Sequence, residues 1–275
     1  AGNPKLKPAR SENYDAYWSV YNNEIGLFTL GGFYKKIDNT FFQTGIFYPN
    51  LNHYDASFPG DDVWDALNAQ SPTGSQTVTT YINNPNPAYV RGLEVEWQTN
   101  FWYLPKPLNS MVLNINYTRS WSEMDYQQLR NIDSTYKDPD NPRFLKHKYI
   151  TRDTVLTARL LHQGDHNLNI VLGTDYKDFS GRISFRMQGD VITSVGSRPE
   201  ENAFTGNFYR WDFTLKQKLP FLDGLSVALN GVNVFHNPLY EYRRFRRTVD
   251  GNVKDNKTSI AYSPRIFELN LRYNF

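Results

Sequence analysis

The feature that most constrains this chain is a repeated alternation of apolar and polar residues. Its clearest example is the last stretch, Ile266–Phe275, where Phe267, Leu269, Leu271, Tyr273 and Phe275 alternate with Glu268, Asn270, Arg272 and Asn274. Successive side chains of a β-strand point to opposite faces, so a period of two predicts a strand with one apolar and one polar face. Each such run has roughly 10–12 residues, close to the length of a tilted strand that crosses a bilayer.

Nine segments of the chain show this pattern, and helical periodicity is essentially absent. The segments are Glu12–Tyr21, Gly26–Asp38, Tyr89–Phe101, Ser110–Trp121, His166–Tyr176, Phe179–Gln188, Tyr209–Leu219, Leu225–Val234 and Ile266–Phe275. In seven of them the pattern separates the two faces, whereas the facing of Gly26–Asp38 is ambiguous and that of Leu225–Val234 is not assigned. We therefore expect an all-β fold with about nine antiparallel strands.

The connections between these segments alternate in length. Four are tight: "NNEI", "YLPKPLN", "KD" and "PFLDG". The intervening stretches 39–88, 122–165, 189–208 and 235–265 are long and rich in Asn, Asp, Pro, Ser and Gly. Short turns on one side and long loops on the other are typical of an outer-membrane barrel, with the turns in the periplasm. The alternative, a soluble β-sandwich, predicts strands of about five or six residues and no such asymmetry.

Composition agrees with a membrane barrel and excludes several function classes. Aromatic residues make up 16% of the chain, and no apolar stretch is long enough for a transmembrane helix. Cysteine is absent, so disulfides and thiolate metal sites are excluded. The formal net charge of +2 does not indicate a nucleic-acid partner. We find no catalytic or metal-binding motif and expect neither an enzyme nor a cofactor.

Several stretches resemble the C-terminal part of a TonB-dependent outer-membrane receptor. "NPKLKPARSENYDAYW" resembles a segment of the form NP-x-L-KPE-x-S-x-NYD found in mid-barrel, and "GLFTLGGFYKKIDN", "AYVRGLEVEWQTNFWYLP" and "LNINYTRSWSE" resemble the strand pairs that follow it. "NFYRWDFTLKQKLP", "LSVALNGVNVFHNPLY" and "FELNLRYNF" resemble the closing strands. The resemblance covers essentially all 275 residues and implies a multi-pass outer-membrane protein of a Gram-negative bacterium.

The resemblance also implies parts that nine strands do not supply. Such receptors form a 22-stranded barrel around an N-terminal plug, through which they contact TonB. An odd number of strands cannot close as an antiparallel ring, and an open edge in lipid leaves backbone groups unsatisfied. We therefore interpret residues 1–275 as the C-terminal part of a single barrel domain. The plug and the earlier strands are expected upstream or in a companion chain.

Four groups of residues are candidates for a role in the membrane or in function. We expect Leu93, Val95, Trp97, Leu269 and Leu271 to face lipid, because a one-residue slip in register would exchange the two faces. The lumen-facing candidates for substrate or plug contact are Glu94, Glu96, Arg182, Arg186, Arg210, Asp212, Glu268 and Arg272. The candidates for contact with lipopolysaccharide phosphates are Arg243, Arg244, Arg246 and Arg247, since arginine binds phosphate with two donors. The resemblance implies that Tyr273 and Phe275, at the end of the chain, form a signal for the barrel-assembly machinery.

Two functions remain open at this point. The first is active uptake of a nutrient (a siderophore, cobalamin, an oligosaccharide or a peptide), driven by TonB through the plug. The second is a structural or assembly role, in which a barrel of the same fold serves as a scaffold for surface lipoproteins. The sequence does not identify the cargo.

Overall fold

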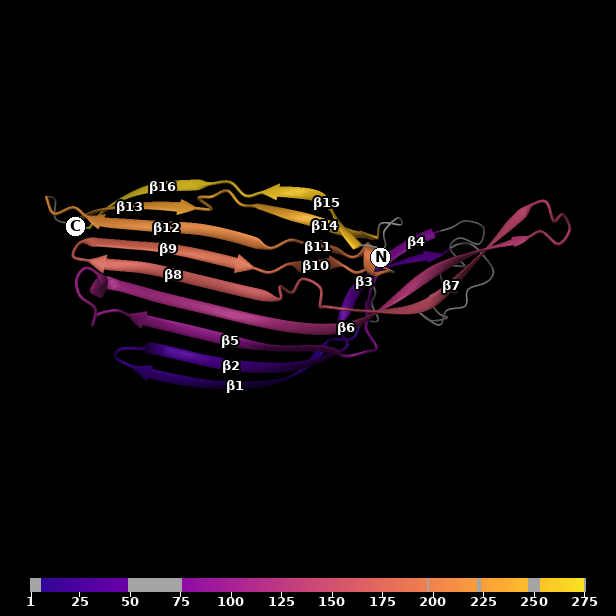
Figure 1. Cartoon of the computed structure of the whole chain (residues 1–275), viewed down its shortest axis with the longest axis horizontal. Coiled ribbons are helices and arrows are strands. Elements are labelled where there is room, and N and C mark those ends of the chain that lie inside the picture. The colour runs from indigo at the N-terminus through magenta and orange to yellow at the C-terminus, as the bar shows by residue number, and fades with distance from the viewer. Residues whose placement is uncertain (1–5, 49–75, 197, 222–223, 247–252, 275) are drawn as a thin grey trace.

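The computed structural model describes residues 6–48, 76–196, 198–221, 224–246 and 253–274. Its main feature is one long antiparallel sheet, in which nine strands follow one another in chain order and β7 pairs with the far end of β6 (Figure 1). The nine strands are β1 (Arg10–Asn22), β2 (Gly26–Asp38), β5 (Ala88–Asn100), β6 (Met111–Lys137), β8 (His166–Tyr176), β9 (Phe179–Gln188), β12 (Phe208–Lys218), β13 (Leu225–Val232) and β16 (Ile266–Tyr273). Each of the nine expected segments is thus confirmed as a strand, and β1 and β16 form the two edges without pairing with each other.

The two ends of the sheet differ as the connection lengths predict. All four tight connections lie at the end that also holds the C-terminus, on the left of Figure 1, and the long connections lie at the opposite end. No helix in the described residues is long and apolar enough to cross a membrane. The described helical turns are the short 3₁₀ segments η1 (Leu108–Ser110) and η2 (Pro199–Glu201).

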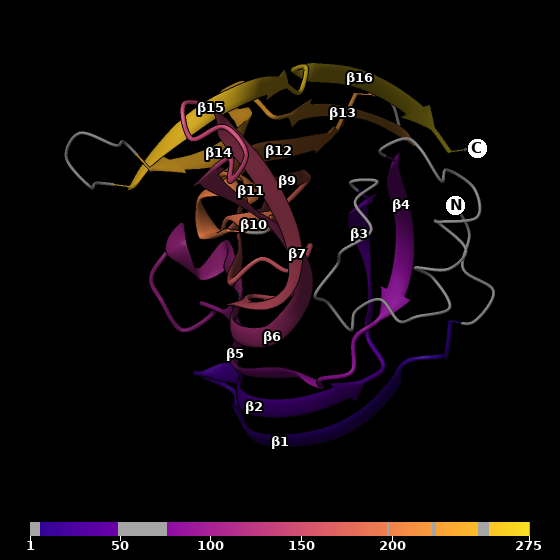
Figure 2. The ribbon, with the colours of Figure 1, turned by 90° about the vertical axis from the view of Figure 1, so that its right-hand side faces the viewer.

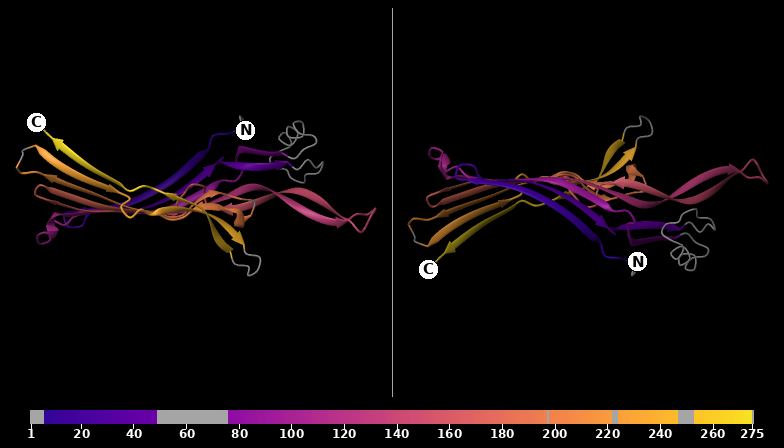
Figure 3. Two further views of the ribbon diagram at one scale, coloured as in Figure 1. Left: turned by 90° about the horizontal axis from the view of Figure 1, so that it is seen from above. Right: turned by 90° about the horizontal axis from the view of Figure 1, so that it is seen from below.

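The long connections contain more regular structure than the sequence indicated. We expected loops there, but their described parts hold the strands β3 (Phe41–Tyr48), β4 (Gln76–Asn83), β7 (Leu145–Ala158), β10 (Val191–Ser194), β11 (Ala203–Thr205), β14 (Pro238–Arg246) and β15 (Val253–Tyr262). β6 itself continues to Lys137, and with β7 it forms a hairpin that projects beyond the other elements (Figure 3). Backbone pairing therefore extends well past the segments with clear alternation.

The strand register divides the sheet into two faces. One row across neighbouring strands reads Trp18, Leu30, Val95, Tyr117, Leu168, Met187 and Tyr209. The row on the opposite face reads Ser19, Thr29, Glu96, Asn116, Asn169, Arg186 and Arg210. We call the first, apolar face the outer face and the second, polar face the inner face. The register also determines the facing of β2, which was ambiguous in the sequence: Phe28 and Leu30 belong to the outer face.

The inner face is the concave one. Figure 2 shows the sheet curved around the β3–β4 hairpin. Phe42 and Ile82 of that hairpin form a buried cluster with Ala88, Met124 and Tyr126. In the unbroken register of β6, Met124 and Tyr126 lie on the same side as Asn116, so the hairpin sits against the polar face. The core of this molecule is thus small and local, at the end of the sheet that holds the long hairpins.

Candidate functional site

The inner face carries charges that are separated by a strip of amides. Glu94 and Glu96 come from β5, whereas Arg182, Arg186 and Arg210 come from β9 and β12. Between them, β6 and β8 contribute the inner-face residues Asn114, Asn116, Asn167 and Asn169. Asp212, Glu268 and Arg272 complete the set, since they pair with Ser184, Asn230 and Ser226 of the inner face. All eight lumen-facing candidates therefore lie on this face, as the alternation predicted.

The carboxylate of Glu94 is held by a side chain from two strands away. The ring of Tyr17, on β1, lies over Gly31 of β2, where an added Cβ would be 2.4 Å from Tyr17 Cε1. The Tyr17 hydroxyl then donates a hydrogen bond of 3.0 Å to Glu94 Oε2. The Glu96 carboxylate accepts a bond of 2.5 Å from the Gln98 amide. Gly31 is thus the residue that lets Tyr17 reach across the strand between them.

Two of the three inner-face arginines on β9 and β12 are already paired. Arg182 binds both carboxylate oxygens of Asp175, at 2.5 and 3.0 Å. Arg210 donates to Asp212 Oδ2 at 2.9 Å, and Asp212 Oδ1 accepts from the backbone N–H of Asn233 at the same distance. Arg186 is exposed between them and has no polar partner among the described residues.

The remaining two candidates lie on the edge strand. Glu268 and Arg272 are exposed on β16, and Arg272 Nε donates to Asn274 at 3.1 Å. Tyr273 is the last residue of β16 and pairs with Leu225, whereas Phe275 lies outside the described residues. Arg243, Arg244 and Arg246 have described backbone in β14, but their side chains and all of Arg247 lie outside the described part of the chain.

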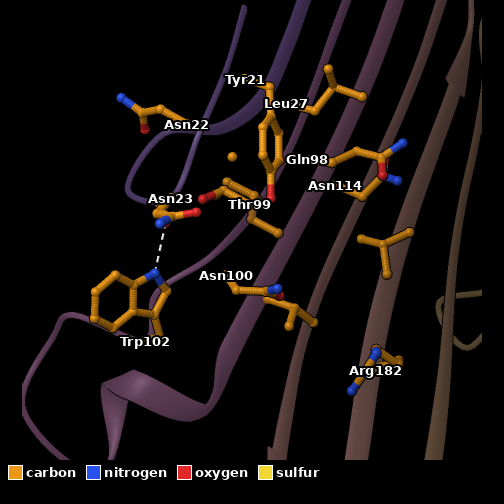
Figure 4. A pocket seen from close by; sticks show the side chains of 14 residues that line it. Tyr21, Asn22, Asn23, Leu27, Gln98, Thr99, Asn100, Trp102, Asn114 and Arg182 are labelled. Atoms are coloured by element: carbon orange, nitrogen blue, oxygen red, sulfur yellow. Dashed lines mark hydrogen bonds between the residues drawn. The ribbon is translucent and has the colours of Figure 1, made fainter.

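A pocket of about 760 Å³ opens on the inner face near the tight turns (Figure 4). Its lining combines the amides of Asn22, Asn23, Gln98, Asn100 and Asn114 and the rings of Tyr21 and Trp102 with the aliphatic side chains of Leu27, Val112, Leu113 and Val171. The Trp102 indole donates to the carbonyl of Asn23 at 2.7 Å, which fixes the ring at the rim. Arg182 is the one charged side chain among the described lining residues. The sequence offered a signal for this site that we did not use: Tyr17 and Tyr21 alternate with the apolar residues of β1 and so interrupt its polar face.

One polar network lies on the outer face, at the end of the sheet that holds the long hairpins. Arg119 belongs to that face because it pairs with Leu93 and His166. It donates to Asp165 Oδ2 at 2.7 Å, contacts the His166 ring, and lies over the Trp121 ring. Arg159 joins the same carboxylate to Asp190. These ionic groups partner one another through Asp165 Oδ2, whereas Asp165 Oδ1 is buried without a hydrogen-bond partner from the residues that the structure describes.

A long antiparallel sheet with an apolar convex face and a polar concave face defines the wall of a transmembrane β-barrel. The model of the family "TonB dependent receptor-like, beta-barrel" matches residues 1–234, and the chain belongs to that family. It is therefore part of a multi-pass outer-membrane protein of Gram-negative bacteria, with short periplasmic turns and long extracellular hairpins. Members of this family are transporters, which supports the expectation that the chain is not an enzyme.

A solved structure supports the fold independently. The chain is similar to the ferric enterobactin receptor of Pseudomonas aeruginosa, crystallised as a double mutant, with a TM-score of 0.52 and 16% sequence identity. The match covers 98% of this chain and 32% of that receptor, so the chain spans about a third of its length. No curated protein matches the sequence. The barrel described here is partial, because β1 and β16 are unpaired with each other at the two edges of the sheet.

Proposed function

We propose that this chain is the C-terminal wall of a barrel that actively imports a nutrient across the outer membrane. The observation that supports it most is the continuous inner face, where polar side chains from nine strands line the concave side of a sheet that belongs to the receptor family. A polar interior gives a hydrophilic solute a route through the bilayer. The solute enters from the side of the long hairpins and leaves at the tight turns.

The plug and the remaining strands come from the rest of the same polypeptide or from a companion chain. Glu94 and Glu96 place two carboxylates at neighbouring inner-face positions of β5. Carboxylates inside a barrel are favourable when they meet a cation, so we propose that they pair with basic residues of the plug. TonB acts on the barrel through that plug. The paired arginines Arg182 and Arg210 carry less free charge and are secondary candidates.

Two further partners follow from the ends of the strands. We propose that Arg243, Arg244, Arg246 and Arg247 bind lipopolysaccharide phosphates; the backbone of the first three belongs to β14. Tyr273 and Phe275 are proposed as the signal for the barrel-assembly machinery. Removal of Phe275 should reduce the amount of protein in outer-membrane fractions more than it reduces the affinity for any ligand. Normal surface levels of the truncated protein would contradict this role.

The import function can be tested genetically with the complete gene. Cells that lack it should lose growth on one nutrient class from a panel of ferric siderophores, cobalamin, oligosaccharides and peptides. Cells that lack TonB should lose growth on the same nutrient. The double variant Glu94→Gln, Glu96→Gln should lower uptake with normal amounts of protein in the outer membrane. Uptake that is independent of TonB would overturn the proposal.

One observation favours the second function, a scaffold for surface lipoproteins. The β6–β7 hairpin projects beyond the other elements and exposes Tyr136, Phe144 and Leu145 near its tip (Figure 3). Exposed apolar groups of this kind mark protein-interaction surfaces. Replacing all three with Ser should leave import unchanged if the protein is an importer, and should release a bound lipoprotein if it is a scaffold. The two functions therefore predict different losses from the same variant.

A further inference from the structure

Aromatic rings follow the inner face of β1 and β2, although this face is otherwise polar. Tyr21 lies at the end near the tight turns, Tyr17 lies four residues further along β1, and Phe33 pairs with Asp15 beyond it. Within the described wall, Tyr17 and Tyr21 are 58% and 74% exposed. Four residues along a strand span about 13 Å, so the rings are spaced along the wall rather than stacked on one another.

Two of these rings lie directly over a glycine of the neighbouring strand. Gly31 lies under Tyr17, and Gly92 lies under Phe33, where an added Cβ would be 2.3 Å from Phe33 Cζ. A ring that rests on a glycine uses one face against the backbone, which leaves the other face of Tyr17 toward the lumen. The Phe33 ring carries the Lys35 ammonium 5.4 Å from its centroid, so a ligand there would meet a cation beside the ring. The hydroxyl of Tyr17 is anchored on Glu94, which fixes the orientation of that ring.

A second pair of rings stands at the extracellular mouth. Phe42 and Ile82 point from the β3–β4 hairpin toward β6, so alternation turns Phe41 and Tyr81 the opposite way. These two rings are in edge-to-face contact, with centroids 6.3 Å apart, and they are 56% and 45% exposed. The buried cluster behind the hairpin supports them. Rings are thus present at the mouth, along the wall and in the pocket near the turns.

The groups that surround the inner end of this row are neutral. Gln98 and Asn114 lie beside Tyr21 in the pocket, together with the amides of Asn22, Asn23 and Asn100 (Figure 4). Amides both donate and accept hydrogen bonds, which suits hydroxyl groups. The charge of Arg182 is neutralised by its two bonds to Asp175. An anionic metal chelate needs free cations, and the described lining residues of this pocket supply none that is unpaired.

We propose that Tyr21, Tyr17 and Phe33 form an aromatic track for a neutral, polyhydroxylated ring compound, which is an oligosaccharide in chemical class. Sugar rings have flat C–H faces that pack on aromatic rings, and hydroxyl edges that bind amides. Phe41 and Tyr81 receive the chain of rings at the mouth, and the pocket beside Tyr21 accepts it before release. The inference rests on the proposed import function, because it names the cargo of the same lumen.

Binding is measured first, with the purified full-length protein and three probes: α-1,4-glucohexaose, β-1,4-glucohexaose and β-1,4-xylohexaose. We expect at least one of them to bind, and the double variant Phe41→Ala, Tyr81→Ala to weaken its affinity about tenfold, which corresponds to about 1.4 kcal/mol. Cyanocobalamin and a ferric tris-catecholate are the counter-probes. The proposal is overturned if no hexasaccharide binds, or if its affinity is the same in the double variant.

Uptake of the same labelled hexasaccharide by intact cells then tests the track. The variant Tyr17→Ala, Tyr21→Ala should lower the initial rate about tenfold, whereas Tyr21→Phe, which keeps the ring, should stay within about twofold. Tyr14→Ala is the matched control, because Tyr14 is 65% exposed on the outer face of the same strand. An unchanged rate in the double variant overturns the track.

The two arms separate this inference from the import function on which it rests. If the hexasaccharide binds through Phe41 and Tyr81 but enters cells without TonB, active import is wrong and the carbohydrate site stands. If TonB-dependent uptake is found for the catecholate or cobalamin, and none for the sugars, active import stands and the aromatic track is overturned.

Discussion

Val95 and Glu96 are neighbours on β5, yet the two faces on which they lie follow opposite rules. The outer face leaves large apolar side chains uncovered, with Leu93 and Leu269 at 51% and 68% exposure, and these positions are stable only in lipid. On the inner face, polar groups bond to one another across strands, as Tyr17 and Glu94 do. The comparison shows that the solvent on each side of the sheet, lipid or water, can determine which face a side chain occupies without a packed core.

The largest expected effect comes from placing a charge on each face in turn. Val95→Arg puts a guanidinium on the outer face, where it should cost about 2–4 kcal/mol in the free energy of unfolding if the site is near the bilayer midplane. Asn116→Arg is the matched control, because Asn116 pairs with Glu96 on the inner face. Urea unfolding of the full-length protein in lipid vesicles measures both. Equal losses for the two variants would mean that the faces are assigned wrongly.

Two adjacent glycines sharpen the comparison. Gly31→Ala adds a methyl group that collides with the Tyr17 ring, and should cost about 1–3 kcal/mol because the Tyr17–Glu94 bond is displaced. At Gly32, on the outer face, an added Cβ meets its nearest atoms at 3.8 Å, which is ordinary contact. Gly32→Ala should therefore be neutral or slightly stabilising. The same unfolding assay applies, and in a Tyr17→Ala background the Gly31→Ala cost should disappear.

Ion pairs on the two faces should also differ. Asp175–Arg182 on the inner face is 53% and 33% exposed, whereas Arg119–Asp165 on the outer face is 24% and 20% exposed. A double-mutant cycle with Asp175→Asn and Arg182→Gln should give a coupling of about 0.5 kcal/mol that falls with added salt. The cycle with Arg119→Gln and Asp165→Asn should give a larger value with weaker salt dependence. A larger coupling on the inner face would contradict the interpretation that the lumen is the wetter side.

The wall could be predicted from the sequence because a single physical rule governs it. Each strand meets lipid on one side and water on the other, so alternation alone assigned Leu93 and Glu94 to opposite faces. The same alternation identified the nine segments that form the main sheet. The hairpins outside the membrane have no such rule. β7 and β14 are held by backbone pairing and local contacts, which leave no period in the residue pattern, and their residues were expected to form loops.

The candidate site was predictable in part for the same reason. Charged residues such as Glu96 and Arg186 stood out on the polar face and do lie there. The rings of Tyr17 and Tyr21 were missed because an aromatic residue in a barrel is first assigned to the lipid side. Their position depends on Gly31 and on the cross-strand register, which bring β1, β2 and β5 together only in the folded sheet.

The smallest expected effect concerns the tip of the β6–β7 hairpin, outside the membrane. A hydrogen bond from Lys146, at 3.0 Å, holds the pKa of Asp138 below its ordinary value. A lowered pKa in the folded state means that the ionised carboxylate stabilises the tip at pH values above the ordinary carboxyl pKa of about 3.9. This contribution is lost as the pH falls through the lowered value.

The backbone hydrogen bond from Asp138 N to Phe144 O, 3.0 Å long, closes the same tip, so exchange of the Asp138 amide measures how often the tip opens. Hydrogen exchange at that amide, corrected for intrinsic rates, should therefore accelerate slightly as the pH falls below about 4, while the amide of Ile170 in the wall stays unchanged. In the Lys146→Ala variant, the corrected exchange rate at the Phe144-bonded amide of Asp138 should no longer rise below about pH 4. If the rate rises equally in the variant and in the unmodified protein, the Lys146–Asp138 ion pair does not stabilise the tip.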